Sequence, residues 1–282
     1  MLNVLRAGLR MGRVTTSYPA SRDPVNPAYR GRPALEASRC TCCSDCVTAC
    51  PAQVISLVGS TLRLDLAGCI FCGLCEDACP EDAIHLTPEF ELAAENRADL
   101  VEVWNVSGGQ AVTPRQNGAV AGNVIPATEA RRLNGRIRTL LARSLHIRHM
   151  DAGSDNACDW EIAALLGPVY DVQRLGIDVV ASPRHADMLL VTGPVTRHLE
   201  PALRATYEAM PRPGLVVAVG DEACGGGVLK GSYAVAGGVD RVLPVDVYIP
   251  GSPPRPQALI HGILLALGGT QPYRQPQTVG TE

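Results

Sequence analysis

A cysteine motif that occurs twice in one short segment constrains this chain more than any other feature. The spacing C-x2-C-x2-C-x3-C-P spans residues 40–51 and recurs 29 positions later, at residues 69–80. Nine of the 11 cysteines lie between Cys40 and Cys79. Each motif leads into a short apolar run, at residues 54–57 and 83–86, which predicts a strand. The spacer at residues 59–68 predicts a hairpin. The segment is therefore an internal repeat.

This doubled spacing is the signature of a bacterial two-cluster ferredoxin. Three thiolates of one loop bind one iron–sulfur cube, and the fourth cysteine, one helical turn later, faces the other cube. We therefore expect one [4Fe–4S] cluster on Cys40, Cys43, Cys46 and Cys79, and another on Cys69, Cys72, Cys75 and Cys50. Cys42 falls outside this frame and is interpreted as an extra thiol. The alternative is a pair of zinc knuckles, which would require neither the crossed ligand nor the Cys-Pro step.

Composition excludes several classes of protein. The chain has 282 residues, of which 46% are hydrophobic and 19% charged, so it can bury a core and about two domains are expected. The net charge of -3 and the 4% aromatic content give no reason to bind nucleic acid. No apolar run has the length of a membrane-spanning helix. We also see no secretory signal, so the cysteines are expected to bind metal or do redox chemistry rather than form disulfides.

The remaining residues divide into segments of different character. We expect an N-terminal extension (1–35), a ferredoxin-like domain (36–90), a helix and linker (91–145), a second domain (146–270) and a tail (271–282). The apolar residues at the start of the chain have helical spacing, which predicts a short amphipathic helix. This helix lies either on a membrane or a partner subunit, or against the protein's own domain. Residues 87–104 are interpreted as helical and polar. An arginine-rich stretch at 131–148 is a solvated helix face or a docking arm for an acidic partner.

Residues 150–270 alternate helices with short apolar strands. Strands are predicted at 177–181, 187–191 and 215–220, and helices near 160–168, 199–209 and 256–267. Apolar, β-branched strands between helices indicate a small parallel sheet covered on both faces.

Separated motifs in this region carry a family resemblance. The stretch from Asp155 to Thr196, GDEACGGG (220–227) and VDVYIPGSPPRP (245–256) resemble the small subunit of energy-converting [NiFe]-hydrogenases and the related complex I subunit. The N-terminal part resembles the ferredoxin-type subunit of formate hydrogenlyase-like complexes. The resemblance implies an α+β two-cluster ferredoxin-like domain followed by an α/β flavodoxin-like domain. The chain thus resembles a fusion of two subunits of one electron-transfer complex.

The departures from that family concern a third cluster. The family holds it with four cysteines, and the matching positions here are Asp155, Cys158, Glu222 and Ser252. Cys224 stands two residues late and would need a shifted loop to contribute. Oxygen ligands suit iron–sulfide chemistry poorly, so we expect a degenerate pocket without a cluster. A different metal on these residues, or an intact third cluster, are the alternatives.

Three further residues have weaker interpretations. His185 matches the family and is either near the pocket or the large-subunit interface, or an ordinary surface or core histidine. Glu161 matches an acidic position of the family, and the alternative is an ordinary buried pair. Arg184 is a candidate cation for the carboxylates of the pocket.

The resemblance implies electron transfer in a membrane-associated oxidoreductase, with no catalytic residues in this chain. Expected partners are a hydrogenase-like or complex I-like large subunit and integral membrane subunits, at the cytoplasmic face of the membrane. The alternative is a structural adaptor of a hydrogenase-related complex whose cluster site is degenerate.

Overall fold

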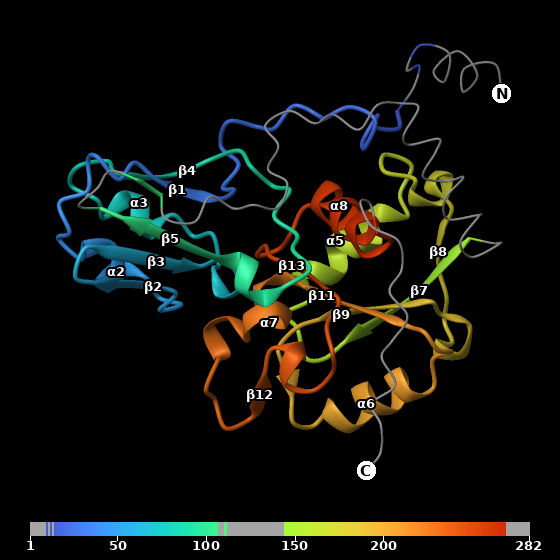
Figure 1. The fold of residues 1–282 in the computed structure, drawn as a ribbon. Helices are drawn as coiled ribbons and strands as arrows, with labels where there is room; N and C mark the ends of the chain where they lie inside the picture. Colours follow the sequence, from blue (N-terminus) through green and yellow to red (C-terminus); the bar gives the residue numbers. More distant parts are fainter. Residues whose placement is uncertain (1–9, 11, 13, 107–109, 112–143, 269–282) are drawn as a thin grey trace.

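A computed structural model describes residues 14–106, 110–111 and 144–268, together with residues 10 and 12. Most of the expected N-terminal helix, most of the linker, the arginines before residue 144 and the expected tail lie outside these residues. The two cysteine loops form one end of the molecule, and a parallel sheet with its helices forms the other (Figure 1). No helix in the described part of the chain is both long and apolar enough to cross a bilayer.

The N-terminal module is built from two small antiparallel sheets and two short helices. β1 (Pro33–Leu35) pairs with β4 (Ile84–Leu86). A second sheet has the order β2-β3-β5-β6. Its strands are β2 (Ile55–Val58), β3 (Thr61–Asp65), β5 (Val101–Asn105) and β6 (Gln110–Ala111). The helices are α2 (Asp45–Ala49) and α3 (Leu74–Asp77), each directly inside a cysteine motif. The predicted strand–hairpin pattern is confirmed for β2 and β3.

The sequence repeat is also a repeat of backbone conformation. Residues 29 positions apart adopt the same left-handed φ angles. The pairs are Cys42 (59°) with Phe71 (51°), Ser44 (70°) with Gly73 (87°), and Gln53 (52°) with Asp82 (46°). Side chains at equivalent positions of the two loops are therefore presented in the same way.

The C-terminal module contains a five-stranded parallel sheet in the order β13-β11-β9-β7-β8. Its strands are β7 (Leu145–Asp151), β8 (Ile177–Val179), β9 (Met188–Thr192), β11 (Leu215–Val219) and β13 (Val247–Ile249). In chain order within the sheet this is 2-1-3-4-5, the flavodoxin-like arrangement. Every residue of the central β9 is buried, as expected for a strand covered on both faces. The predicted parallel sheet is confirmed.

Helices cover both faces of this sheet. The helices are α5 (Ala157–Leu165), α6 (Glu200–Glu208), α7 (Gly220–Gly225) and α8 (Pro256–Ala266). Buried residues of α5 and α8 share one core cluster with alternate residues of the strands, and those of α6 and α7 share the other. A small antiparallel sheet of β10 (Val195–Thr196) and β12 (Val235–Gly237) lies beside α6 (Figure 1).

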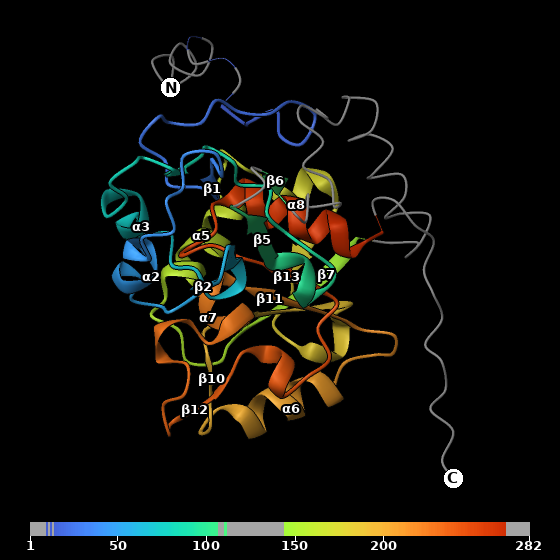
Figure 2. The same ribbon diagram turned by 60° about the vertical axis from the view of Figure 1, so that its left-hand side comes forward.

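The two modules share a continuous core. One buried cluster joins Leu62 and Leu66 of the N-terminal module to Leu189 and Val216 of the sheet. The 3-10 helix η1 (Leu66–Gly68) lies against α7, which both views place between the modules (Figures 1 and 2). The approach is so close that a Cβ on Gly225 would lie 2.7 Å from the carbonyl oxygen of Ala67. The two modules therefore pack directly against each other and are not joined by the chain alone.

The expected helix at residues 87–104 is wrong. The structure has a 3-10 helix, η2 (Arg97–Leu100), followed by strand β5. The reason is the alternation within β5, where Glu102 is 4% exposed and its carboxylate pairs with the Arg32 guanidinium. In the sequence alone, a buried glutamate that pairs with a distant arginine looks the same as an exposed glutamate of a polar helix. The sequence interpretation also missed β7, because it was grouped with the arginine-rich stretch.

The N-terminal extension is a strap over the C-terminal module. Tyr18 is 2% exposed and belongs to the core cluster of α5 and α8. Its hydroxyl donates to Glu91 Oε1 at 2.9 Å, and its carbonyl accepts from Arg174 Nη2 at 2.6 Å. Further along, Gln257 Nε2 donates to Asp23 Oδ2 at 3.0 Å. The extension thus joins segments that are distant in the sequence.

Replacing Tyr18 tests the strap. We expect Tyr18→Ala to lower the free energy of unfolding by about 3 kcal/mol, because it removes a buried ring and leaves a cavity. Tyr233→Ala is the matched control, since Tyr233 is 92% exposed, and its effect should stay within about 0.5 kcal/mol. Anaerobic urea unfolding followed by tryptophan fluorescence measures both. Equal effects of the two variants would show that the strap does not stabilise the fold.

Candidate metal centres

Cysteines from both motifs surround a space that we call the Cys40 cavity. Its cysteines are Cys40, Cys42, Cys43, Cys46 and Cys79. The last of these comes from the second motif, and the others from the first. Apolar side chains, among them Leu35, Leu57 and Leu62, complete the wall.

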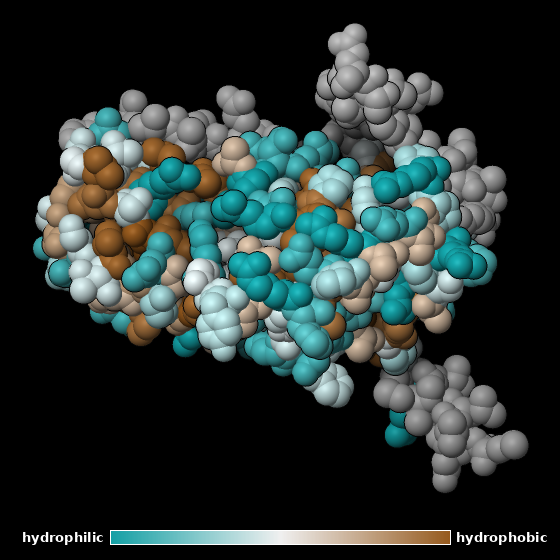
Figure 3. Space-filling model, turned by 90° about the horizontal axis from the view of Figure 1, so that it is seen from below, coloured by the Kyte–Doolittle hydropathy of each residue, from teal (hydrophilic) through white to brown (hydrophobic). Residues whose placement is uncertain are grey.

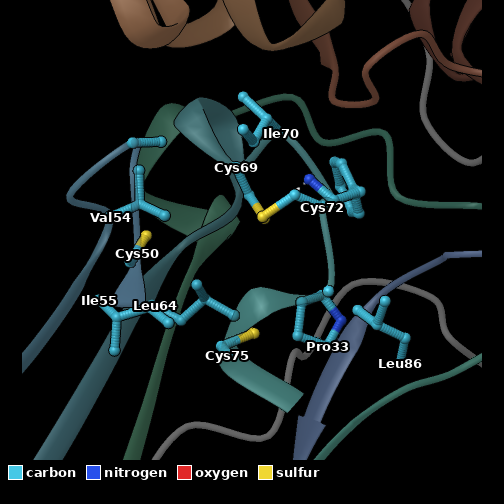
Figure 4. A pocket seen from close by; sticks show the side chains of 13 residues that line it. Pro33, Cys50, Val54, Ile55, Leu64, Cys69, Ile70, Cys72, Cys75 and Leu86 are labelled. Carbon is cyan, nitrogen blue, oxygen red and sulfur yellow. Dashed lines mark hydrogen bonds between the residues drawn. The ribbon is translucent and has the colours of Figure 1, made fainter. Parts of the chain in front are cut away.

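The second space, the Cys69 cavity, has the reciprocal composition. It is lined by Cys69, Cys72, Cys75 and, from the first motif, Cys50. Figure 4 shows these cysteines around the cavity among apolar residues such as Ile55 and Leu64. The Cys69 and Cys40 cavities enclose about 360 and 380 Å³ of space, which includes open solvent.

The electrostatics of the thiols follow the same crossed grouping. Burial raises the pKa of Cys46 to about 11, and the thiols that add to this are Cys43, Cys40 and Cys79. Burial likewise raises the pKa of Cys69 to about 12, with smaller contributions from three other thiols. Those three are Cys75, Cys50 and Cys72. Metal binding must therefore displace protons from these groups, as is general for thiolate ligands.

Backbone amides point at some of the sulfurs. The Phe71 N–H donates to Cys69 Sγ at 3.4 Å, and the Ala83 N–H donates to Cys79 Sγ at 3.2 Å. Hydrogen bonds of this kind stabilise negative charge on sulfur and help to set the potential of an iron–sulfur cluster. Sequence reasoning missed them because they depend on the left-handed turn at Phe71 and its counterparts. Soft donors, apolar walls and N–H···S bonds together fit a [4Fe–4S] cluster in each cavity.

A third group of residues gathers at the carboxyl ends of the parallel strands. Asp155 and Cys158 follow β7, Glu222 follows β11 and Ser252 follows β13. This is the edge at which doubly wound sheets place their ligand sites. The structure brings the four residues together. Burial raises the pKa of Cys158. The nearby carboxylates of Asp221, Glu222 and Asp155 raise it further.

The carboxylates of this pocket perturb one another. Burial raises the pKa of Glu222 to about 7, and the nearby Asp221 and Asp155 carboxylates add to the shift. Burial also raises the pKa of Asp221 to about 6, although a hydrogen bond from Ser252 acts to lower it. The sequence interpretation did not include Asp221, although it directly follows β11 in the GDEACGGG stretch. Among the described residues, no three His, Cys, Asp or Glu side chains are arranged to hold a single metal ion.

The backbone holds the Cys158 thiol tightly. Gly220 has φ of 89°, and a Cβ there would lie 2.5 Å from Cys158 Sγ. The Asp221 N–H donates to the carbonyl oxygen of Gly251 at 2.9 Å, which ties the loop after β11 to the loop after β13. Cys224, in contrast, is fully buried and its thiol donates to the Ala218 carbonyl oxygen. The loop shift that would present Cys224 is therefore not seen.

Arg184 and His185 do not lie near the pocket. Both residues are exposed and lie in the turn before β9, where the His185 carbonyl contacts His146 Nδ1 at 3.1 Å. That turn is at the amino ends of β7 and β9, whereas the pocket is at their carboxyl ends. Arg184 is therefore not placed to pair with the pocket carboxylates, and of the two interpretations of His185 the structure shows a surface residue. Burial raises the pKa of Glu161, and the Arg255 guanidinium opposes that shift.

Comparisons with known proteins identify the family. Residues 156–266 match the family described as NADH ubiquinone oxidoreductase, 20 Kd subunit, and residues 38–84 match the 4Fe-4S dicluster domain. A probable membrane-bound hydrogenase subunit of Pyrococcus furiosus is 47% identical over 50% of this chain and 86% of its own length. The chain belongs to this family. It is an iron–sulfur electron-transfer subunit of the type found in membrane-bound hydrogenases, formate hydrogenlyases and complex I.

Two other relatives show the breadth of this family. Formate hydrogenlyase subunit 7 of Escherichia coli is 49% identical over 45% of this chain and 50% of its own length. A subunit of the NADH-quinone oxidoreductase of Bacteroides thetaiotaomicron is 50% identical over 39% of this chain and 56% of its own length.

Paired substitutions test the crossed grouping of cysteines. Cys46 and Cys79 line the same cavity, so Cys46→Ala with Cys79→Ala should leave the other cluster intact, at about four irons per chain. Cys46→Ala with Cys50→Ala damages both cavities and should leave almost no iron. Iron and sulfide analysis of anaerobically purified protein measures this. The reverse pattern would mean that each cluster is bound by its own motif alone.

The raised pKa of Glu222 predicts a pH-dependent stability. Protonation is easier in the folded than in the unfolded chain, so the stability that it contributes is complete only below the ordinary glutamate pKa of 4.5 and is lost as pH rises through about 7. Glu222→Gln should therefore match the wild type near about pH 4 and be more stable at about pH 8.5. Urea midpoints at both values measure this. Glu208→Gln, on the exposed face of α6, is the control, and a wild-type-like profile for Glu222→Gln would contradict the assignment.

Proposed function

We propose that this chain carries two [4Fe–4S] clusters and exchanges electrons within a membrane-associated oxidoreductase. The proposed ligands are Cys40, Cys43, Cys46 and Cys79 for one cluster, and Cys69, Cys72, Cys75 and Cys50 for the other. The observation that carries the assignment is the crossed lining of the two cavities. Each proposed cluster takes three ligands from one motif and its fourth from the other, and Cys42 lines the Cys40 cavity as a fifth thiol.

When bound, such clusters take up and release single electrons. The protein contributes the thiolates, the apolar walls that exclude water and the N–H groups directed at sulfur. The two cavities differ in their surroundings. Cys43 is exposed, whereas Cys69 is buried and directly follows η1, which packs on α7. We therefore place exchange with an external partner at the Cys40 cavity and exchange with the C-terminal side at the Cys69 cavity.

The third pocket is proposed to hold no cluster. Three of its four positions offer oxygen, and Glu222 and Asp221 have pKa values raised toward the neutral form. Protonated carboxyls and hydroxyls are poor ligands for iron in a sulfide cube. The second candidate function, a full three-cluster relay, is favoured only by the one thiol that remains, Cys158.

The surface near the pocket favours a large protein partner. Trp160, two residues after Cys158, is 75% exposed, and Val228 and Leu229, shortly after Glu222, are 57% and 46% exposed. Seen from below, apolar side chains also gather at the end formed by the cysteine loops (Figure 3). We propose that a hydrogenase-like or complex I-like large subunit covers the pocket side. Integral membrane subunits would hold the assembly peripherally, at the cytoplasmic face.

A structural adaptor is the alternative from another class. In that role the C-terminal module would serve assembly alone, and the clusters would serve another reaction. The close packing of η1 on α7 favours electron transfer, because it brings the Cys69 cavity against the module that meets the partner. Reduction of the purified complex separates the two: a relay exchanges electrons with the partner's centres, and an adaptor does not.

Restoring the missing thiols tests the empty third site. The native chain should contain about eight irons after anaerobic reconstitution. The triple variant Asp155→Cys, Glu222→Cys and Ser252→Cys should bind about four more. The matched control is Asp155→Ser with Glu222→Ser. Serine is close to cysteine in size but offers oxygen instead of sulfur, so this variant should bind no additional iron. About twelve irons in the native chain would establish the full relay instead.

The proposed large-subunit face predicts the effect of one surface change. Trp160→Glu places a charge in the apolar patch and should reduce copurification of the large subunit at least about tenfold, since buried aromatic residues dominate interfaces. The iron content should not change, because Trp160 lies in neither cavity. Tyr233 is also highly exposed, and Tyr233→Glu tests whether the partner face extends to this residue. Unchanged copurification with Trp160→Glu would place the partner elsewhere.

A further inference from the structure

The two cavities differ in their number of thiols. The Cys40 cavity is lined by five cysteines and the Cys69 cavity by four. The additional residue is Cys42, which the spacing of the motif leaves without a role. Its equivalent in the second loop, 29 positions later, is Phe71.

The backbone shows that this correspondence is structural. Cys42 has φ of 59° and Phe71 has φ of 51°, and both residues line the cavity of their own loop. Phe71 is 8% exposed and lines the Cys69 cavity, and its N–H donates to Cys69 Sγ. The residue at this position of each loop therefore lies at the wall of its cavity. In the first loop that residue carries sulfur.

The neighbouring ligand is the one that most needs support. Cys43 is exposed, whereas its counterpart Cys72 is partly buried. Exposed thiolates are the first to be oxidised or displaced by solvent. Cys42 is partly buried and adjoins Cys43 in a loop that has neither helix nor strand before α2 begins at Asp45. Both thiols line the same cavity.

We propose that Cys42 is a reserve ligand for the cluster of the Cys40 cavity and replaces Cys43 when that ligand is lost. This inference rests on the proposed two-cluster assignment. In the exchange, the Cys42 thiol releases its proton to solvent and its sulfur bonds to the iron. The bond between iron and Cys43 breaks, and Cys43 takes up a proton. No electron is transferred, and the charge of the cluster does not change.

The test uses the second loop as an internal control. The full chain is purified anaerobically, and iron, sulfide and the electron paramagnetic resonance of the reduced clusters are measured. The wild type and Cys42→Ala should each contain about eight irons. Cys43→Ala should keep about eight, because Cys42 takes over, and Cys42→Ala with Cys43→Ala should fall to about half. Cys72→Ala should also fall to about half, since Phe71 cannot replace it.

A gain-of-function variant completes the test. Phe71→Cys added to Cys72→Ala should restore about eight irons, because it transfers the extra thiol to the second loop. Equal loss of iron in Cys43→Ala and in the double variant would overturn the proposal. If Cys43→Ala does not fold, failure of Phe71→Cys to restore the Cys72→Ala cluster overturns it. A wild type without iron would instead contradict the two-cluster assignment itself.

Discussion

Each cysteine cavity is closed by a residue from the opposite half of the repeat. Cys79 completes the first cavity and Cys50 the second. On the proposed assignment neither cluster has all four of its ligands without a cysteine from the other half, so the two halves must fold against each other before either proposed site is complete. This mutual dependence fixes the distance between the sites and the orientation of α2 and α3. It also explains why the backbone repeats so closely, down to the left-handed residues of each turn.

The packing of η1 on α7 extends this order to the rest of the molecule. η1 ends one residue before Cys69, and α7 begins beside the degenerate pocket, so a single contact links the two regions. An ion pair stabilises the same side of the N-terminal module. Arg97 donates to both carboxylate oxygens of Asp65 at 2.7 Å. A core that continues through this contact keeps the modules at fixed separation, which electron transfer requires. The C-terminal module has this geometry with Asp155, Glu222 and Ser252 at the positions where the family resemblance implies thiolates.

Much of this could be predicted from the sequence, and the exceptions have physical reasons. The cysteine spacing and the apolar runs indicated the repeat, the hairpin and most parallel strands, because local periodicity determines them. The strand β5 was missed since Glu102 is buried through a partner, Arg32, that lies far away in the sequence. A position of Arg184 and His185 near the pocket was wrong because both residues precede β9 and so lie at the amino ends of the strands. Asp221 and the N–H···S bonds depend on turns whose geometry appears only in three dimensions.

The N-terminal strap has a consequence for the order of events during synthesis. Asp23 and Gln257 are 234 residues apart, and Tyr18 packs in the core that α8 completes. The segment that holds Tyr18 and Asp23 therefore cannot complete these contacts until α8 has been made. The cysteine loops are translated during that interval. On the proposed assignment, iron and sulfide can reach them while the core of the C-terminal module is still incomplete.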